Sequence, residues 1–179
     1  MPKIYTKTGD SGTTSLYDGT RTGKDSIYFD VLGNNDELTS RIGLVYVLMK
    51  DRSDSLDISN ILRNIQSTIQ DINSNIAKAK VTISEDKVTE LEKYIDIMTS
   101  ELPTLTKFIL PGENFVDANI HMCRTQTRKV ERELWIMNQT IEIDKVICQY
   151  MNRLSDFFFT LARWETHNFI IPRYDLKGL

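Results

Sequence analysis

Residues 58–76, ISNILRNIQSTIQDINSNI, carry the clearest periodicity in the chain. Isoleucine or leucine recurs at steps of three and four residues from Ile58 to Ile76, and the positions between them are polar. Because an α-helix has about 3.6 residues per turn, this spacing puts the apolar side chains on one stripe. The segment therefore predicts an amphipathic helix that buries one face against other helices.

Four further helices are expected around this one. They are predicted at about residues 31–50, 82–98, 115–138 and 141–169, each with its own apolar stripe. The helix predicted at 82–98 begins at Thr82, which forms a capping-box pattern with Glu85. Trp135 and Trp164 are assigned to the core. With no convincing strand pattern elsewhere, the fold class is all-α, a five-helix bundle.

Composition restricts the kind of partner. The chain has 179 residues, of which 40% are apolar and 26% charged, and its net charge is −3. These values fit one folded domain with a substantial core. Without a basic cluster we expect no nucleic acid and no membrane as partner, and the binding partner should be a small molecule. Residues 1–10 resemble neither a signal nor a transit peptide, and no apolar run has membrane-spanning length, so we expect a cytoplasmic protein.

The cysteines and histidines give little sign of a metal site. Cys123 and Cys148 are too few and too far apart for a disulfide framework or a zinc site, so we expect buried thiols. His121 and His167 lie on different predicted helices and lack a ligand partner one turn away.

The first 30 residues are predicted to form a loop. Residues 6–15, TKTGDSGTTS, combine two glycines with Lys7 and several hydroxyl groups. Glycines allow backbone N–H groups to converge on an anion, and hydroxyls with a lysine can complete a phosphate site. A polar turn that ties down the N-terminus would have the same composition. Both interpretations remain open at this point.

A second glycine-rich stretch, GTRTGKD at residues 19–25, comes close to a P-loop. It is one residue short between its glycines, and Asp25 stands where Ser or Thr would bind magnesium. It is therefore not a Walker A motif, although Lys24 can still reach a phosphate as a point charge.

The fourth predicted helix carries a polar face. Arg124, Arg128, Glu131 and Trp135 follow one another at spacings of four, three and four residues. They either form a solvated stripe or, with neighbouring basic residues, clamp a polyphosphate while Glu131 holds hydrated Mg²⁺. Asn152 on the fifth helix can be either a satisfied core amide or a reader of ribose or adenine.

Five segments recur together in one known family. The segments are KIYTKTGDSGTTSLYDG (3–19), VLGNNDELTSRIGL (31–44), KFILPG (107–112), CRTQTRKVERE (123–133) and MNRLSDFFFTLAR (151–163). In this order and spacing they resemble the PduO-type family of ATP:cob(I)alamin adenosyltransferases. Two positions depart from the family's usual pattern, since Glu113 replaces a glycine and Lys129 replaces an arginine.

The resemblance implies a ferritin-like five-helix bundle that assembles as a homotrimer, with each active site between subunits. The positions that match the family's ATP-binding residues are divided between neighbours. One subunit would supply Thr6, Lys7, Thr8, Gly9, Thr14, Ser15 and Lys24. The other would supply Arg128, Lys129, Glu131, Arg132 and Asn152.

The resemblance also implies a site for the corrinoid. Asp36 and Arg124 match a pair that forms a salt bridge near it, and Phe108 matches an aromatic residue that crowds the lower face of cobalt. The implied reaction transfers the 5′-deoxyadenosyl group of ATP to cob(I)alamin and releases triphosphate, with Mg²⁺ as cofactor. A reductase that supplies electrons and an adenosylcobalamin-dependent enzyme would be further partners.

Two other functions are compatible with the same residues. A non-catalytic ATP- and corrinoid-binding module could deliver the corrinoid or regulate assembly. A purely structural bundle is the third, but it gives the glycine- and hydroxyl-rich loop no task. The domain expectation is one unit over residues 1–179, with residues 1–30 as nucleotide-binding loop and residues 31–169 as bundle.

Overall fold

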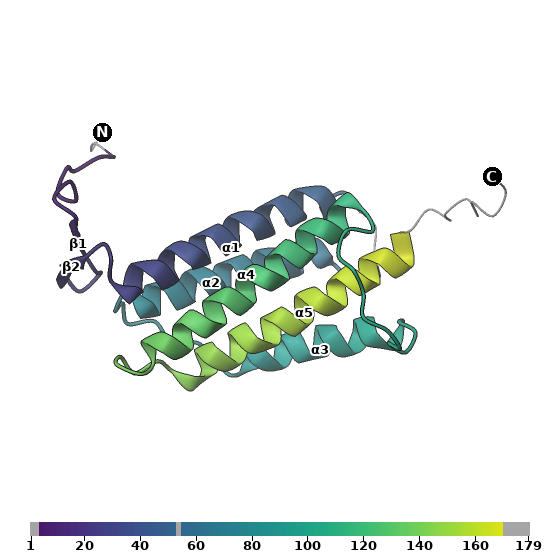
Figure 1. Ribbon diagram of the computed structural model, residues 1–179. Helices are drawn as coiled ribbons and strands as arrows, with labels where there is room; N and C mark the ends of the chain where they lie inside the picture. The colour runs from purple at the N-terminus through teal and green to yellow at the C-terminus, as the bar shows by residue number, and fades with distance from the viewer. Residues whose placement is uncertain (1–3, 53–54, 170–179) are drawn as a thin grey trace.

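Five helices form an elongated bundle in the computed structural model, which describes residues 4–52 and 55–169 (Figure 1). They are α1 (Ile27–Met49), α2 (Ile58–Ile76), α3 (Asp86–Ser100), α4 (Phe115–Met137) and α5 (Lys145–Phe169). The all-α prediction is thus confirmed for the body of the molecule.

The expectation of a loop without regular structure before α1 is wrong. Strands β1 (Thr13–Ser15) and β2 (Arg21–Gly23) pair antiparallel, with Thr14 opposite Thr22. The turn contains Asp18 and Gly19, a sequence pair that favours tight hairpins, and Gly19 has a positive φ of 86°. The strands lack alternating apolar residues, which is why the pattern gave no strand signal.

Three helix starts differ from prediction for local reasons. Helix α1 begins at Ile27 rather than near residue 31, because the side chain of its N-cap Ser26 accepts the N–H of Tyr28. The capping box at Thr82 does not form, because α3 begins at Asp86 and its N-cap Glu85 makes no side-chain cap bond. Helix α5 begins at Lys145 rather than near residue 141. The side chain of Asp144 accepts the N–H of Val146, and that of Asn138 accepts the N–H of Ile143, so residues 138–144 form a turn.

The core lies between the helices, with α4 packed against both α1 and α5. Cys123 and Cys148 are buried free thiols as predicted, and burial raises the pKa of Cys123 to about 12. Trp164 is buried, but Trp135 is 52% exposed, so its assignment to the core is wrong. Within the described residues, none of the helices has the length and apolarity needed to span a membrane.

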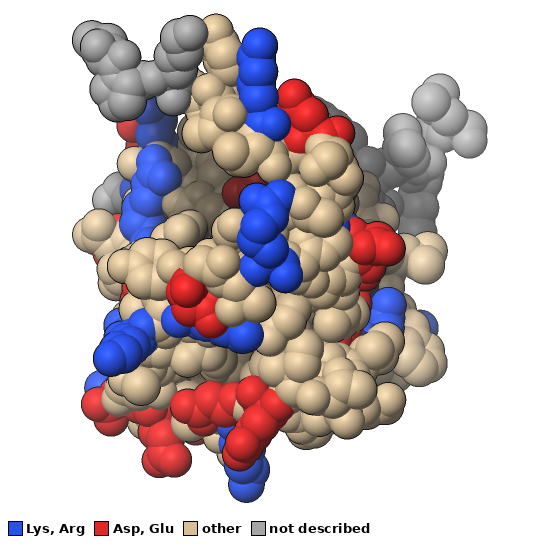
Figure 2. Space-filling view, turned by 90° about the vertical axis from the view of Figure 1, so that its left-hand side faces the viewer, with Lys and Arg blue, Asp and Glu red and all other residues tan. Residues whose placement is uncertain are grey.

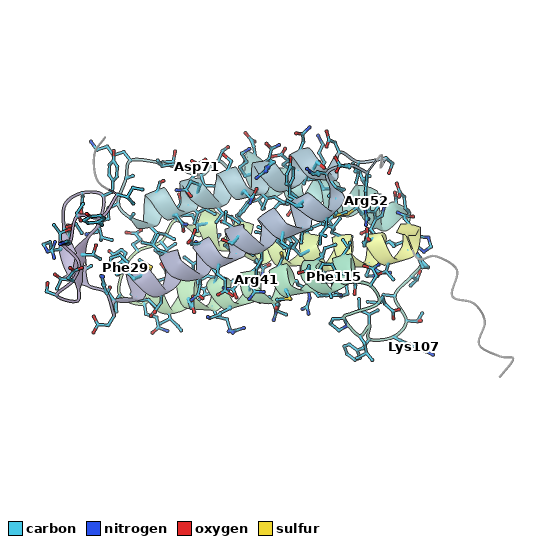
Figure 3. The ribbon with its side chains drawn as sticks, turned by 90° about the horizontal axis from the view of Figure 1, so that it is seen from above. Phe29, Arg41, Arg52, Asp71, Lys107 and Phe115 are labelled. Atoms are coloured by element: carbon cyan, nitrogen blue, oxygen red, sulfur yellow. The ribbon has the colours of Figure 1, made fainter. Side chains whose placement is uncertain are left out.

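The two non-helical segments that matter for function lie at opposite ends of the bundle (Figure 1). The hairpin precedes α1, and the connector, residues 101–114, precedes α4, which starts at the other end. Figure 3 shows Lys107 on this connector outside the bundle, near Phe115 at the start of α4 and far from Phe29 at the hairpin end. Pro111 and Gly112, residue types that interrupt helices, lie within this connector, and no helix forms over residues 103–114.

Candidate functional site

The N-terminal segment is folded onto the hairpin by one arginine. The guanidinium of Arg21 donates to the carbonyl oxygens of Thr8 (3.1 Å) and Thr13 (3.2 Å), and also to the Thr13 hydroxyl. The hydroxyls of Thr6 and Thr8 are 2.8 Å apart. These contacts hold residues 6–8 against the hairpin.

Lys24 completes this group. Its backbone N–H donates to the carbonyl of Gly12 (2.9 Å), and its Nζ lies so close to Gly9 that a Cβ there would be 3.1 Å away. Lys7 adopts a positive φ of 61°, which is uncommon for a residue with a side chain. The structure therefore brings together five of the residues that are predicted to bind ATP, which are Thr6, Lys7, Thr8, Gly9 and Lys24.

The remaining two N-terminal residues lie on β1. Thr14 and Ser15 are neighbours in the strand, so their side chains project to opposite faces of the hairpin. Ser15 is exposed and Thr14 half-buried. Figure 2 shows Lys and Arg side chains on both sides of a hollow on the end of the molecule that carries the hairpin, with an acidic side chain deeper inside it.

The basic residues of α4 divide between two faces. Arg128 and Arg132 are exposed and form no salt bridge within residues 4–52 and 55–169. Lys129 points the other way, since its Nζ donates to Asn34 Oδ1 on α1 (2.7 Å). Two exposed guanidinium groups one turn apart are thus available to a ligand.

Glu131 and Asn152 meet across α4 and α5. The amide of Asn152 donates to Glu131 Oε1 at 2.9 Å, and both line a pocket of about 450 Å³ at the junction of α3, α4 and α5. Asn152 is exposed, so the interpretation of its side chain as a satisfied core amide is wrong. Trp135 lines the same pocket, so sequence reasoning missed a pocket residue by assigning this side chain to the core.

Phe108 lies at the far end of the bundle. Its side chain is fully exposed and lines a pocket of about 740 Å³ between the connector and the end of α5. Other lining residues include Leu110, Asp117, Arg163 and His167. The pocket is large enough for a substantial organic ligand.

Asp36 and Arg124 are not paired within the described chain. Arg124 instead donates from Nε to Nδ1 of the buried His121 (3.0 Å), and Asp36 is exposed on α1. Burial, followed by the charge of Arg128, lowers the pKa of Arg124. Burial likewise lowers the pKa of His121, so a neutral imidazole accepts the arginine N–H. His121 and its neighbour Asp117 had no functional signal in the sequence.

Comparison with known proteins identifies relatives of the whole chain. A family model described as "Cobalamin adenosyltransferase" matches residues 4–165. Corrinoid adenosyltransferase MMAB from Homo sapiens is 38% identical over 174 residues, covering 92% of this chain and 69% of that protein. Corrinoid adenosyltransferase from Bacillus subtilis is 39% identical over 165 residues, covering 90% and 85%.

Solved structures give the same result. A phenylalanine-to-alanine variant of a PduO-type ATP:corrinoid adenosyltransferase from Lactobacillus reuteri, complexed with cobalamin and ATP, superposes with a TM-score of 0.86. It is 31% identical, and the match covers 92% of this chain and 94% of that one.

Proposed function

The chain belongs to the cobalamin adenosyltransferase family, and we propose that its hairpin and the arginine face of α4 meet across a subunit boundary to form the active site. The reaction is the transfer of the 5′-deoxyadenosyl group of ATP to a reduced corrinoid. The observation that carries the proposal is the separation of the hairpin and the Phe108 connector in one chain.

This separation supports a site that is shared between chains. Helix α1 has 23 residues and runs between the two ends, so the hairpin and the connector are about 35 Å apart along the bundle axis. The 5′ carbon of ATP must come within bonding reach of cobalt. If ATP binds at the hairpin and the corrinoid beside Phe108, the two segments must come from different subunits.

A homotrimer satisfies this requirement by repeating one head-to-tail contact until the ring closes. Exposed apolar side chains on the packed pair α1 and α4 support such a contact. They are Leu44, Val47, Phe115 and Met122.

In this arrangement the chain neutralises the leaving group. Lys7 and Lys24 from one subunit and Arg128 with Arg132 from the other would face the triphosphate. Glu131 would hold Mg²⁺, which would offset further negative charge on the leaving group. A cobalt(I) electron pair forms the bond to the 5′ carbon while the carbon–oxygen bond breaks, and its electrons leave with triphosphate. No protein base is needed.

The remaining assignments complete the site. Thr6, Thr8, Gly9, Thr14 and Ser15 contact the nucleotide from the hairpin, and Asn152 orients its ribose or adenine. Lys129 adds positive charge beside the arginines without contacting phosphate, since it is bound to Asn34. Asp36 of one subunit pairs with Arg124 of the next.

Phe108 has a separate task, because it lies away from the phosphate site. Its exposed ring occupies the space of a lower axial ligand and so makes reduction of cob(II)alamin easier. A reductase supplies that electron, and an adenosylcobalamin-dependent enzyme receives the product.

The protein is proposed to work in the cytoplasm. Residues 1–179 are proposed to form one domain.

The activity is tested directly with purified protein, ATP, Mg²⁺ and chemically reduced cobalamin. Loss of the cob(I)alamin absorbance with stoichiometric triphosphate release is expected. Binding of both substrates without triphosphate release would identify a delivery or regulatory module instead. Omission of Mg²⁺ should slow the reaction, because one of the cations that neutralise the departing triphosphate would be missing.

A further inference from the structure

Asp117 is a buried carboxylate that holds the connector. It lies in the first turn of α4 and is 2% exposed. Its Oδ2 accepts the N–H of Gly112 (2.7 Å) and of Glu113 (3.0 Å). Because a buried carboxylate needs such donors, these bonds fix the C-terminal end of the connector to α4.

The Phe108 segment depends on attachments at its two ends. Arg163 on α5 donates to the carbonyl of Pro103 (2.7 Å) at the other end. Between these points, residues 104–111 make no hydrogen bond within the described part of the chain. The direction of the segment is set by Gly112, whose φ of +105° is rarely adopted by residues with a side chain. The position of Phe108 is therefore decided by how its ends are held.

The second oxygen of Asp117 faces the interior. Oδ1 accepts the hydroxyl of Thr166 on α5 (3.3 Å) and lies 3.5 Å from Nε2 of His121. His121 in turn accepts the N–H of Arg124. One carboxylate thus contacts the connector, α5 and the histidine that orients Arg124.

Helix capping does not account for this arrangement. The N-cap is Asn114, whose side chain accepts the N–H of Asp117 (2.8 Å). Asp117 reaches back past the cap to two N–H groups outside the helix, and it lines the pocket beside Phe108. We propose that Asp117 is a positioning residue that holds the Phe108 segment at the corrinoid pocket. This inference rests on the proposed function, which takes that pocket as the corrinoid site.

The first measurement needs no corrinoid. Hydrogen exchange of the Gly112 and Glu113 amides should accelerate about tenfold or more in Asp117→Ala, because their acceptor is lost. In Asp117→Asn the exchange should stay within about threefold of wild type, since one carbonyl oxygen can accept both N–H groups. Unchanged exchange in folded Asp117→Ala would overturn the proposal.

The second measurement is kinetic. Asp117→Ala should raise KM for cobalamin about tenfold while KM for ATP stays within about twofold, and Asp117→Asn should restore most of the difference. A merely structural role would lower the active fraction and leave both KM values unchanged. An equal rise in both values would also contradict the assignment. Should wild-type protein itself lack adenosylation, the proposed function fails, while the exchange result still decides whether Asp117 anchors the connector.

Two further variants complete the test. Asp57→Ala removes another carboxylate from a helix start, where it accepts the N–H of Asn60 (3.1 Å) on α2. It should lower stability without changing KM for cobalamin. Gly112→Ala strains the connector and leaves Asp117 in place, so it should raise KM for cobalamin even if Asp117→Ala does not fold. A normal value in Gly112→Ala would count against control by the connector.

Discussion

At the scale of single residues, Arg128 differs from the arginines that support the fold. Arg41 pairs with Glu37, Arg52 with Glu165, and Arg153 with Glu92 and Asp156. Arg128 has no salt bridge within the described residues and is exposed. An exposed arginine without an acidic partner is available to bind an anion.

Arg128→Ala is expected to reduce kcat/KM for ATP about tenfold to hundredfold, because a charge-assisted contact of about 1.5–3 kcal/mol is lost. The helix should remain folded, since the side chain is exposed. Steady-state kinetics and circular dichroism measure the two effects. Arg63→Ala is the control, because it removes an arginine of α2 that is not assigned to the site. The guanidinium of Arg63 lies 3.7 Å from the ring centroid of Tyr46 on α1. Equal values of kcat/KM for ATP in the two variants would show that Arg128 belongs to a solvated stripe and does not bind ATP.

Phe108 allows electron transfer to be separated from nucleotide handling. Phe108→Ala should admit water or the cofactor's own base beneath cobalt and make cob(II)alamin harder to reduce. Activity should therefore fall strongly with a mild reductase and much less with a strong chemical reductant. ATP affinity should barely change, because the side chain has no differential contact with triphosphate. Equal losses with both reductants would mean that Phe108 only packs the connector.

At the scale of elements, the hairpin determines how the phosphate loop is presented. It is attached to the bundle by the N–H of Tyr17, which donates to the carbonyl of Ala77 (2.9 Å), and by the pair of Lys78 with Asp18 (3.6 Å). Its short strands carry little apolar surface. The geometry around Lys24 therefore depends on local backbone fit more than on burial.

Gly23→Ala tests this dependence. A Cβ at this position would lie 2.2 Å from Oδ1 of Asp25, so the exposed Asp25 side chain must rotate away, directly beside Lys24. KM for ATP should rise several-fold, and the thermal midpoint should change little because the hairpin is outside the core. In Gly33→Ala, where the added methyl meets no atom within 4 Å, both values should stay near wild type or the midpoint should rise. A normal KM in Gly23→Ala would show that the hairpin geometry is not used.

At the scale of the whole molecule, the proposed active site is divided between chains. The hairpin and the connector lie at opposite ends of the bundle (Figure 1). ATP bound at the hairpin and a corrinoid bound beside Phe108 can react only if these two ends of neighbouring copies lie next to each other.

Mixing two impaired variants tests this division. Lys24→Ala damages the hairpin and Arg128→Ala the helix face, so random trimers from equal amounts should regain intact sites at about a quarter of their boundaries. Activity should rise well above that of either variant after co-refolding, and it should stay at the low level of each variant when that variant is assayed alone. Sedimentation should report a trimer in every case. No recovery from well-formed mixed trimers would place both groups in one subunit.

The sequence by itself determined the five helices, since a repeat of apolar residues at three and four positions stabilises one structure wherever it occurs. It also determined the buried thiols, and its linked motifs identified the family. These features depend on neighbours within a few turns. The hairpin was not predicted, because its strands have no apolar alternation. The capping box at Thr82 was predicted but does not form, because α3 begins later in the chain.

Tertiary structure decided which side chains meet. Helical periodicity places Lys129 beside Arg128 in sequence, but packing of α4 on α1 turns it to Asn34. The contact of Glu131 with Asn152 joins two helices, and that of Asp117 with Gly112 reaches back along a turn with a left-handed residue. Such contacts depend on how helices are rotated and spaced, and the pattern of one segment carries no information on its partner's position. For the same physical reason the exposure of Trp135 was missed.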